Sequence, residues 1–417
     1  MARCSILPVA ASMHGDDAVA AIVASLTTCV ASIDAVWVQD VSEADPALPL
    51  LVLVLTGGTE AQVLAADEAR ARGTAPDRQP LVLVTHPDHN SLPAALEALA
   101  RVQRDGGSGC IVPVVPGRRA EALEAAVRDL EVRSTLRRMR LGLVGEPSDW
   151  LVASVPDAAL LAHTWGVTLV DVALGDLVGR LVHDQDVAAA APMAVPVRLG
   201  AHAADGSPPL TELEDAARFE PVLQAAVAAH RLDAVAVRCF DLVTDAHTSG
   251  CLALAALNDR GVIAGCEGDV ASTVAMAWTR ALLGAPGWMA NPSVADPVTG
   301  VLELAHCTVP LSMVDGYTLQ THFESGLGVG IAGELGPGPV TLVRLGGEGL
   351  GRIWCVEGEA LATTPRPERC RTQLDVRIAP AEVADLLSHP LGNHVVLVRG
   401  HHRARLLRWF ESMLPVG

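Results

Sequence analysis

Four consecutive residues offer the most informative chemistry in the sequence: Cys266, Glu267, Gly268 and Asp269. They follow the apolar run 261–265 and precede a helical pattern. In open α/β sheets, ligands bind outside the carboxyl ends of the strands, and flanking glycines let the backbone approach a ligand closely. The competing interpretation is structural, with Asp269 as a helix N-cap and Glu267 as an acid of the first helical turn. For Asp269 we keep the structural interpretation.

Two histidines in apolar surroundings are candidate partners for Glu267. They are His306 in the segment ELAHC and His394 in the segment LGNHVVLV. A buried imidazole needs a hydrogen-bonding partner, so a purely structural role competes with metal binding at each position. A carboxylate combined with imidazoles, without thiolates, suits Mn²⁺ or a similar hard cation better than a structural zinc ion.

Composition excludes several classes of protein. The chain has no lysine, which rules out Schiff-base aldol chemistry, a pyridoxal phosphate anchor and a P-loop lysine. A formal charge of −18 argues against nucleic acid as a partner. No GxGxxG motif opens the first helix, which disfavours a dehydrogenase.

The cysteines and the apolar runs bear on where the protein works. Nine cysteines stand singly without a CxxC pair, which indicates reduced thiols. The longest apolar run, 48–55, is too short to span a membrane, and no signal peptide is visible. We therefore expect a cytoplasmic protein with no membrane partner.

The pattern of predicted helices and strands is α/β. We expect two doubly wound parallel-sheet domains followed by a β-rich C-terminal domain, a small barrel. Short apolar runs alternate with helical patterns up to Gly284, and short β-like runs punctuated by Gly and Pro follow. Residues 192–209 are expected to be irregular. The predicted domains are 1–139, 140–284 with the Glu267 motif, and 285–417 with His394 and a terminal helix.

Read together, several segments resemble the L-fucose isomerase and L-arabinose isomerase superfamily, especially its shorter fucose-isomerase-like members. The similar segments follow the family's order over nearly the whole chain. They are TGGTE at 56–60, NSLP at 90–93, VGEPSDWL at 144–151, VRCF at 237–240, GCLALAALNDRGVIAGCEGD at 250–269, AHC at 305–307, HFESGLGV at 322–329, GPVTLVRL at 338–345 and GNHVVLVRG at 392–400.

The resemblance implies a divalent metal, Mn²⁺ or another cation, whose ligands fall on Glu267, Asn291 and His394, with His306 near a further ligand position. It also implies proton transfer between adjacent carbons of an open-chain sugar through an enediol, with the metal polarising the carbonyl. Asn291 stands where the family usually has an acid, and an amide cannot accept a proton. Either Asp296 serves as the second carboxylate, or the proton transfer is altered or lost.

Other positions are candidate sugar contacts. Trp150 could stack on a sugar face, with core packing as the alternative, and Arg238 could bind a hydroxyl or an anionic substituent. Glu60 and Asn90 follow strands of the first domain, which in relatives can close the site of a neighbouring subunit.

We therefore expect a metal-dependent aldose–ketose isomerase acting on a free or modified pentose or hexose, with Glu267, Asn291 and Asp296 as catalytic candidates. An epimerase or lyase on the same scaffold and a non-catalytic sugar-binding paralogue are the alternatives. Relatives imply a homo-oligomer, a trimer or hexamer.

Overall fold

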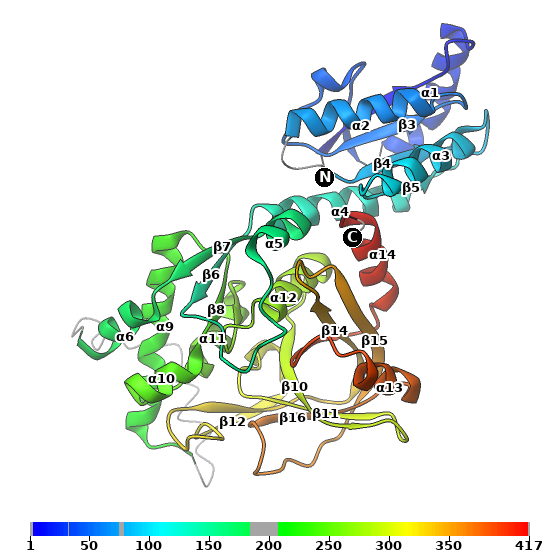
Figure 1. Ribbon diagram of the computed structural model, residues 1–417. Coiled ribbons are helices and arrows are strands. Elements are labelled where there is room, and N and C mark those ends of the chain that lie inside the picture. The colour runs from blue at the N-terminus through cyan, green and yellow to red at the C-terminus, as the bar shows by residue number, and fades with distance from the viewer. Residues whose placement is uncertain (1–2, 32, 75–78, 184–206, 416–417) are drawn as a thin grey trace. The chain divides into compact units, whose positions relative to one another are not determined.

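The computed structural model describes residues 3–31, 33–74, 79–183 and 207–415 (Figure 1). The fold is α/β, with two parallel sheets followed by an antiparallel barrel, which confirms the predicted fold class. The chain forms two compact units, Met1–Thr135 with Leu407–Gly417, and Leu136–Leu406. Residues 192–206 of the segment predicted to be irregular lie outside the described residues, and the boundaries predicted after residues 139 and 284 stay predictions.

The first unit is built on a five-stranded parallel sheet with the order β2-β1-β3-β4-β5. Its central strands β3 and β4 are buried along their whole length, as expected for a parallel sheet that helices cover. The strands are β1 (Arg3–Val9), β2 (Asp34–Trp37), β3 (Leu50–Val54), β4 (Leu81–Thr85) and β5 (Gly109–Pro113). The helices are α1 (Asp16–Val30), the 3₁₀ turn η1 (Val41–Glu43), α2 (Glu60–Thr74), α3 (Ser91–Arg104) and α4 (Glu121–Arg137).

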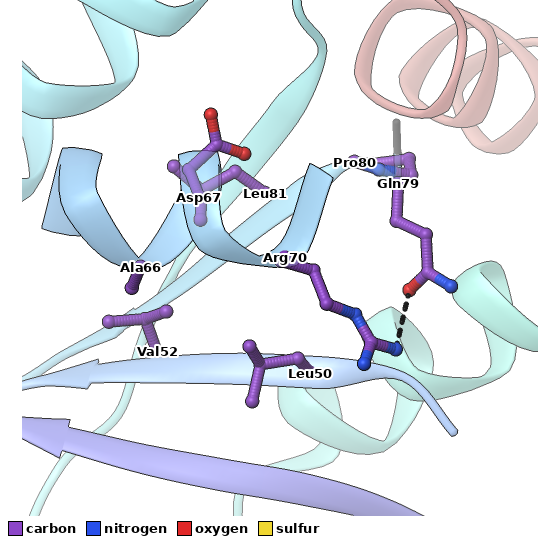
Figure 2. A pocket seen from close by; sticks show the side chains of 8 residues that line it. All are labelled: Leu50, Val52, Ala66, Asp67, Arg70, Gln79, Pro80 and Leu81. Carbon is purple, nitrogen blue, oxygen red and sulfur yellow. Dashed lines mark hydrogen bonds between the residues drawn. The ribbon is translucent and has the colours of Figure 1, made fainter. Parts of the chain in front are cut away.

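A buried arginine closes one end of this sheet. Figure 2 shows Arg70 of α2 above Leu50 and reaching the side chain of Gln79, to whose Oε1 it donates at 3.2 Å. Its guanidinium also donates to the carbonyl oxygens of Asp45 at 3.3 Å and Pro46 at 3.2 Å. The cavity beside it is only about 10 Å³, room for at most one water molecule. Arg70 therefore ties a loop to the sheet and does not form a ligand site.

The last helix, α14 (Arg403–Met413), begins in the second unit and ends in the first. Its Trp409 is completely buried, and the indole Nε1 donates to the carbonyl oxygen of Asp129 in α4 at 3.1 Å. An indole N–H that is buried needs such an acceptor, so this bond fixes where the end of α14 packs.

The second unit opens with a four-stranded parallel sheet of order β7-β6-β8-β9. Its strands are β6 (Arg140–Val144), β7 (Thr168–Val172), β8 (Ala234–Val237) and β9 (Ile263–Gly265). Its helices are α5 (Ala158–Trp165), α6 (Leu174–His183), α9 (Leu210–His230), α10 (Cys239–Ala246), α11 (Cys251–Arg260) and α12 (Val270–Leu283). The carboxyl ends of β8 and β9 lie side by side, because Ala236 pairs with Gly265 in parallel register.

A closed antiparallel barrel of order β10-β11-β16-β15-β14-β17 completes this unit. Alternate side chains of its strands fill the interior with aliphatic residues and two tryptophans, Trp288 and Trp354. The strands are β10 (Trp288–Asp296), β11 (Val301–His306), β14 (Gly338–Gly346), β15 (Arg352–Leu361), β16 (Thr372–Arg377) and β17 (Val395–Arg399). The hairpin β12 (Gly316–Gln320) and β13 (Gly330–Glu334), the 3₁₀ turn η2 (Leu311–Met313) and the helix α13 (Pro380–Ser388) lie outside it.

Candidate metal centre

Glu267 stands at the turn from β9 into α12 in a backbone conformation that side chains rarely adopt, with φ of 60°. Such a conformation costs on the order of 1–3 kcal/mol and persists only where the surroundings enforce it. Here Ser148 N donates to the Glu267 carbonyl oxygen at 2.9 Å, and Gly268 N donates to Val237 O at 2.9 Å. A Cβ on Gly268 would lie 2.8 Å from Pro147 Cα, so glycine is required next to Glu267. The turn is built to aim this carboxylate.

Three side chains converge at the carboxylate, and we call them the metal trio: Glu267, His306 and His394. All three are buried, and one potential ligand atom from each lies within 4.8 Å of the other two. Glu267 Oε1 is 3.3 Å from His394 Nε2 and 3.7 Å from His306 Nε2. His306 ends β11 and His394 directly precedes β17, the two strands that pair with β10 in the barrel. One carboxylate and two imidazoles can hold a divalent cation.

The orientation of His394 is fixed from behind by Asp269. His394 Nδ1 lies 2.8 Å from Asp269 Oδ2, which directs Nε2 towards Glu267. A carboxylate behind a histidine in this way fixes the ring and increases its strength as a metal ligand. Asp269 also accepts hydrogen bonds from Ser272 N and Ser272 Oγ, both at 2.8 Å. The predicted N-cap is therefore confirmed, and the same carboxylate has a second role.

A completely buried arginine balances the charge of Asp269. Arg344 Nη1 lies 3.2 Å from Asp269 Oδ2, while Nη2 donates to Ser154 Oγ at 2.6 Å and Nε to Leu391 O at 3.3 Å. A Cβ on Gly392, whose φ is 134°, would collide with this guanidinium. Burying an ion pair is costly unless hydrogen bonds satisfy both partners, and here they do.

These contacts set the protonation of the site. Burial alone would raise the pKa of Glu267, but the hydrogen bonds and positive charges of His306 and His394 hold it well below its ordinary range. Burial likewise would raise the pKa of Asp269, yet Arg344 and His394 lower it to about 2. Burial would lower the pKa of His394, but hydrogen bonds and negative charges from Asp269 and Glu267 raise it to about 9. A proton on His394 therefore competes with a metal ion.

Trp150 lies beside the trio and not in a core. Its indole Nε1 donates to Glu267 Oε2 at 2.6 Å, and half of the residue is exposed. Its ring meets Phe240 edge to face at 4.9 Å between centroids, and Phe240 meets His322 in the same way at 5.5 Å. Trp150 therefore holds the Glu267 oxygen that does not face the histidines, while its stacking on a sugar stays a prediction.

Arg238 is engaged by carboxylates of its own neighbourhood. Its Nε lies 2.9 Å from both oxygens of Asp241, and its Nη1 donates to Pro147 O at 2.6 Å and to Asp149 at 3.1 Å. Hydrogen bonds to Asp149 and Asp241 raise the pKa of the guanidinium. Arg238 therefore fixes the loop that carries Trp150, and its predicted contact with substrate remains a prediction.

The remaining predicted residues have different surroundings. Asn291 of β10 pairs with Ala305, the neighbour of His306, and the adjacent Ala290 pairs with Val395, the neighbour of His394. This register places the Asn291 backbone between the two histidine-bearing strands, but its role as a ligand is untested. Asp296 accepts hydrogen bonds from Val298 N at 2.8 Å and Thr299 Oγ1 at 2.6 Å, in the turn between β10 and β11.

Two predicted sugar contacts belong to the first unit. Glu60 begins α2, and Asn90 precedes α3 in a left-handed conformation with φ of 58°. Their role in substrate binding also stays a prediction.

A larger cleft of about 350 Å³ lies elsewhere in the second unit. It is lined by the β12–β13 hairpin and residues 365–373, including Glu334 and Arg366, and it contains no member of the metal trio. Within the part of the chain that the structure describes, the metal trio is the convergent set of buried ligand atoms. The cleft and the trio are therefore separate features of the second unit.

Comparison with known proteins supports a sugar isomerase. No protein-family model matches the sequence. The chain is similar to the sulfoquinovose isomerase of Clostridium sp. (strain MSTE9), with 26% identity over 330 residues that cover 74% of this chain and 72% of that protein. This similarity is compatible with the resemblance to fucose and arabinose isomerases. Among the described residues, no helix has the length and apolar character needed to cross a membrane.

Proposed function

We propose that this protein is an aldose–ketose isomerase that acts on a free or modified pentose or hexose and uses a divalent cation, with Mn²⁺ as the expected metal. The observation that carries the proposal is the convergence of one carboxylate and two imidazoles in a buried site. The similarity to a sulfoquinovose isomerase supports the reaction class. Sulfoquinovose, a hexose with a sulfonate at C6, is therefore the first substrate to test.

The donor set fits a resident cation. Glu267, His306 and His394 would hold it, and Asn291 would add a neutral oxygen. A bound cation would polarise the sugar carbonyl and stabilise negative charge that develops on oxygen. The chain's own residues prepare the site, because Asp269 directs the Nε2 atom of His394 and Trp150 holds the second oxygen of Glu267. The low pKa of Glu267 keeps it ionised as a ligand.

The proton-transfer group is the part of the mechanism on which the alternatives differ. A general base works best when its pKa lies near the working pH, and Glu267 is far below that range. The amide of Asn291 cannot take a proton, and the Asp296 carboxylate is engaged by its own turn. Because an amide stands at Asn291 in place of the family's acid, an epimerase or lyase on the same scaffold is the second candidate. A non-catalytic sugar-binding protein is the third.

The deciding experiment combines metal analysis with solvent exchange. Purified protein is assayed for bound metal, then incubated with Mn²⁺ and sulfoquinovose, glucose, fucose or arabinose in D₂O and followed by NMR. We expect ketose with deuterium next to the carbonyl, lost in Glu267→Gln and retained in Glu68→Gln, an exposed glutamate whose carboxylate lies 3.9 Å from Arg72. Metal-free protein that exchanges no proton on any of these sugars would contradict the proposal.

Asn291→Asp separates the first two candidates. If the standard proton transfer has been weakened by the amide, restoring the acid increases the rate of ketose formation and tightens Mn²⁺ binding. If the protein is an epimerase or lyase, the wild type exchanges deuterium without forming ketose, and the variant does not gain isomerase activity. Light scattering on the same samples tests the expected trimer or hexamer.

A further inference from the structure

Five of the nine cysteines interact with one another near Glu267, although they are scattered along the sequence. All are free thiols; four are buried and Cys370 is half-buried. Cys266 directly precedes Glu267 in the chain, and Cys307 directly follows His306. The five thiols are those of Cys239, Cys251, Cys266, Cys307 and Cys370, and Cys307 shares hydrogen bonds with Cys251 and Cys370.

The closest two sulfur atoms belong to Cys239 and Cys266. Their Sγ atoms are 2.8 Å apart, within about 0.8 Å of the roughly 2.05 Å length of a disulfide bond. Cys239 begins α10 just after β8, and Cys266 directly follows β9. Because Ala236 pairs with Gly265, the two strand ends that carry these cysteines lie side by side. Little movement therefore separates the two thiols from a covalent bond.

A buried cysteine usually behaves as a small apolar side chain, and packing alone does not bring two sulfur atoms this close. Cys29 shows the ordinary arrangement, because its Sγ donates to a backbone carbonyl oxygen, that of Val115, at 3.1 Å. The thiols of Cys239 and Cys266 instead have each other as partners, beside the half-exposed Trp150, whose ring contacts the neighbouring Phe240. Both thiols are buried, with 7% of Cys239 and 3% of Cys266 exposed, so the oxidant that reaches them must be small.

We propose that Cys239 and Cys266 form an oxidation-sensitive pair whose reversible disulfide weakens metal binding at Glu267. The oxidant is a peroxide. One thiolate attacks a peroxide oxygen, the O–O bond breaks, and a sulfenic acid and water or an alcohol form. The second thiolate then attacks that sulfur and water leaves. In total two thiols lose two protons and two electrons, and one peroxide is reduced.

The effect on Glu267 follows from the construction of the turn. Gly268 N and the Glu267 carbonyl oxygen are held by backbone hydrogen bonds to Val237 O and Ser148 N. Drawing Cys266 towards Cys239 therefore changes the backbone at Glu267, the residue with φ of 60°. Metal sites tolerate shifts in ligand distance of only about 0.2 Å. This second part rests on the proposed function, whereas the disulfide does not.

The disulfide is tested on the full-length wild-type protein without metal. It is treated with hydrogen peroxide or diamide, alkylated, and mapped by mass spectrometry without reduction. We expect a mass loss of two hydrogen atoms, a cross-linked peptide pair containing Cys239 and Cys266, and reversal by dithiothreitol. Cys239→Ser and Cys266→Ala abolish the cross-link and Cys110→Ser retains it. No cross-link, or one between other cysteines, overturns the assignment without depending on any variant.

The link to the metal is tested by titrating Mn²⁺ into reduced and oxidised protein. We expect the affinity for Mn²⁺ to fall roughly tenfold or more on oxidation and to recover on reduction. A fall of this size is comparable to the loss of a group that hydrogen-bonds a metal ligand. Cys239→Ser keeps its Mn²⁺ affinity under the same oxidant. Equal affinity of the mapped disulfide form and the reduced form refutes the link. If the reduced wild type binds no Mn²⁺, the proposed function fails, while the peptide map still decides whether the thiol pair exists.

Discussion

Replacing Asp269 by asparagine tests how much of the metal site depends on the residues behind it. The change removes a negative charge that is completely buried but keeps the shape of the side chain. Asp269 Oδ2 lies 2.8 Å from His394 Nδ1, so the variant loses the carboxylate that directs Nε2 of His394 towards the trio. Removing a carboxylate that hydrogen-bonds a metal-binding histidine typically lowers metal affinity about 10–100-fold, or roughly 1.4–2.7 kcal/mol. We expect Mn²⁺ affinity to fall by that amount.

The same change also affects stability, because Arg344 remains charged and buried beside the new amide. Removing one partner of a buried ion pair costs about 3–5 kcal/mol, and the free energy of unfolding should fall accordingly. Asp40→Asn is the matched control. Asp40 accepts hydrogen bonds from Ser42 N and Ser42 Oγ, as Asp269 does from Ser272, but it is exposed and far along the chain from the trio.

The assay is calorimetric titration of Mn²⁺ at low temperature, where the variant is still folded, with urea unfolding measured alongside. NMR of the His394 ring in metal-free protein reports its pKa, which is about 9 in the wild type and should fall in the variant. A folded Asp269→Asn protein that binds Mn²⁺ as tightly as the wild type, with an unchanged His394 titration, would refute the reasoning.

Three further predictions follow from the same site. The folded-state pKa of His394 is about 9 against an ordinary 6.5, so its proton contributes about 3 kcal/mol to the free energy of unfolding of the metal-free protein. This contribution is complete below pH 6.5 and is lost as the pH rises through 9. Urea unfolding across this range should show the loss, and His394→Gln should have a flatter profile. Trp150→Phe removes the N–H that holds Glu267 Oε2, so Mn²⁺ affinity or turnover should fall roughly tenfold. The melting temperature should stay near that of the wild type, because Trp150 is half exposed. Gly268→Ala places a Cβ 2.8 Å from backbone at φ of 68° and should destabilise by about 2–3 kcal/mol. Gly351→Ala, with no atom within 4 Å of the new Cβ, should be neutral in the same unfolding assay.

The fold was predictable where apolar runs are continuous. β3 and β4 are buried on both faces, so LLVLV and LVLVT carry the signal of a parallel sheet by themselves. The two strands before Leu50 have a weaker signal in the sequence. β1 contains Pro8, which interrupts the pattern, and β2 is a four-residue edge strand with mostly exposed side chains. Neither strand has a periodicity that distinguishes it from a loop.

Candidate site residues could be predicted where the neighbouring sequence has a recognisable pattern. The residues that hydrogen-bond or pair with them could not. Glu267 stands between a strand and a helix, but the contact between Asp269 and His394 spans 125 residues and has no local signal. Arg344 was overlooked although a charged residue in the apolar strand VTLVRL is a hint of a buried partner. The cysteine pair was equally hidden, because spacing along the chain says nothing about sulfur atoms that meet in space.

The return of the chain to the first unit has a consequence for how the protein is made. Trp409 completes the packing of α4 through its bond to Asp129, yet the entire segment Leu136–Leu406 is synthesised between them. At about 5–20 residues per second, the ribosome needs roughly a quarter of a minute to a minute for that segment. During this time the α4 surface that receives Trp409 is uncovered. The first unit therefore begins to emerge first, and its packing is completed only when the last helix has been synthesised.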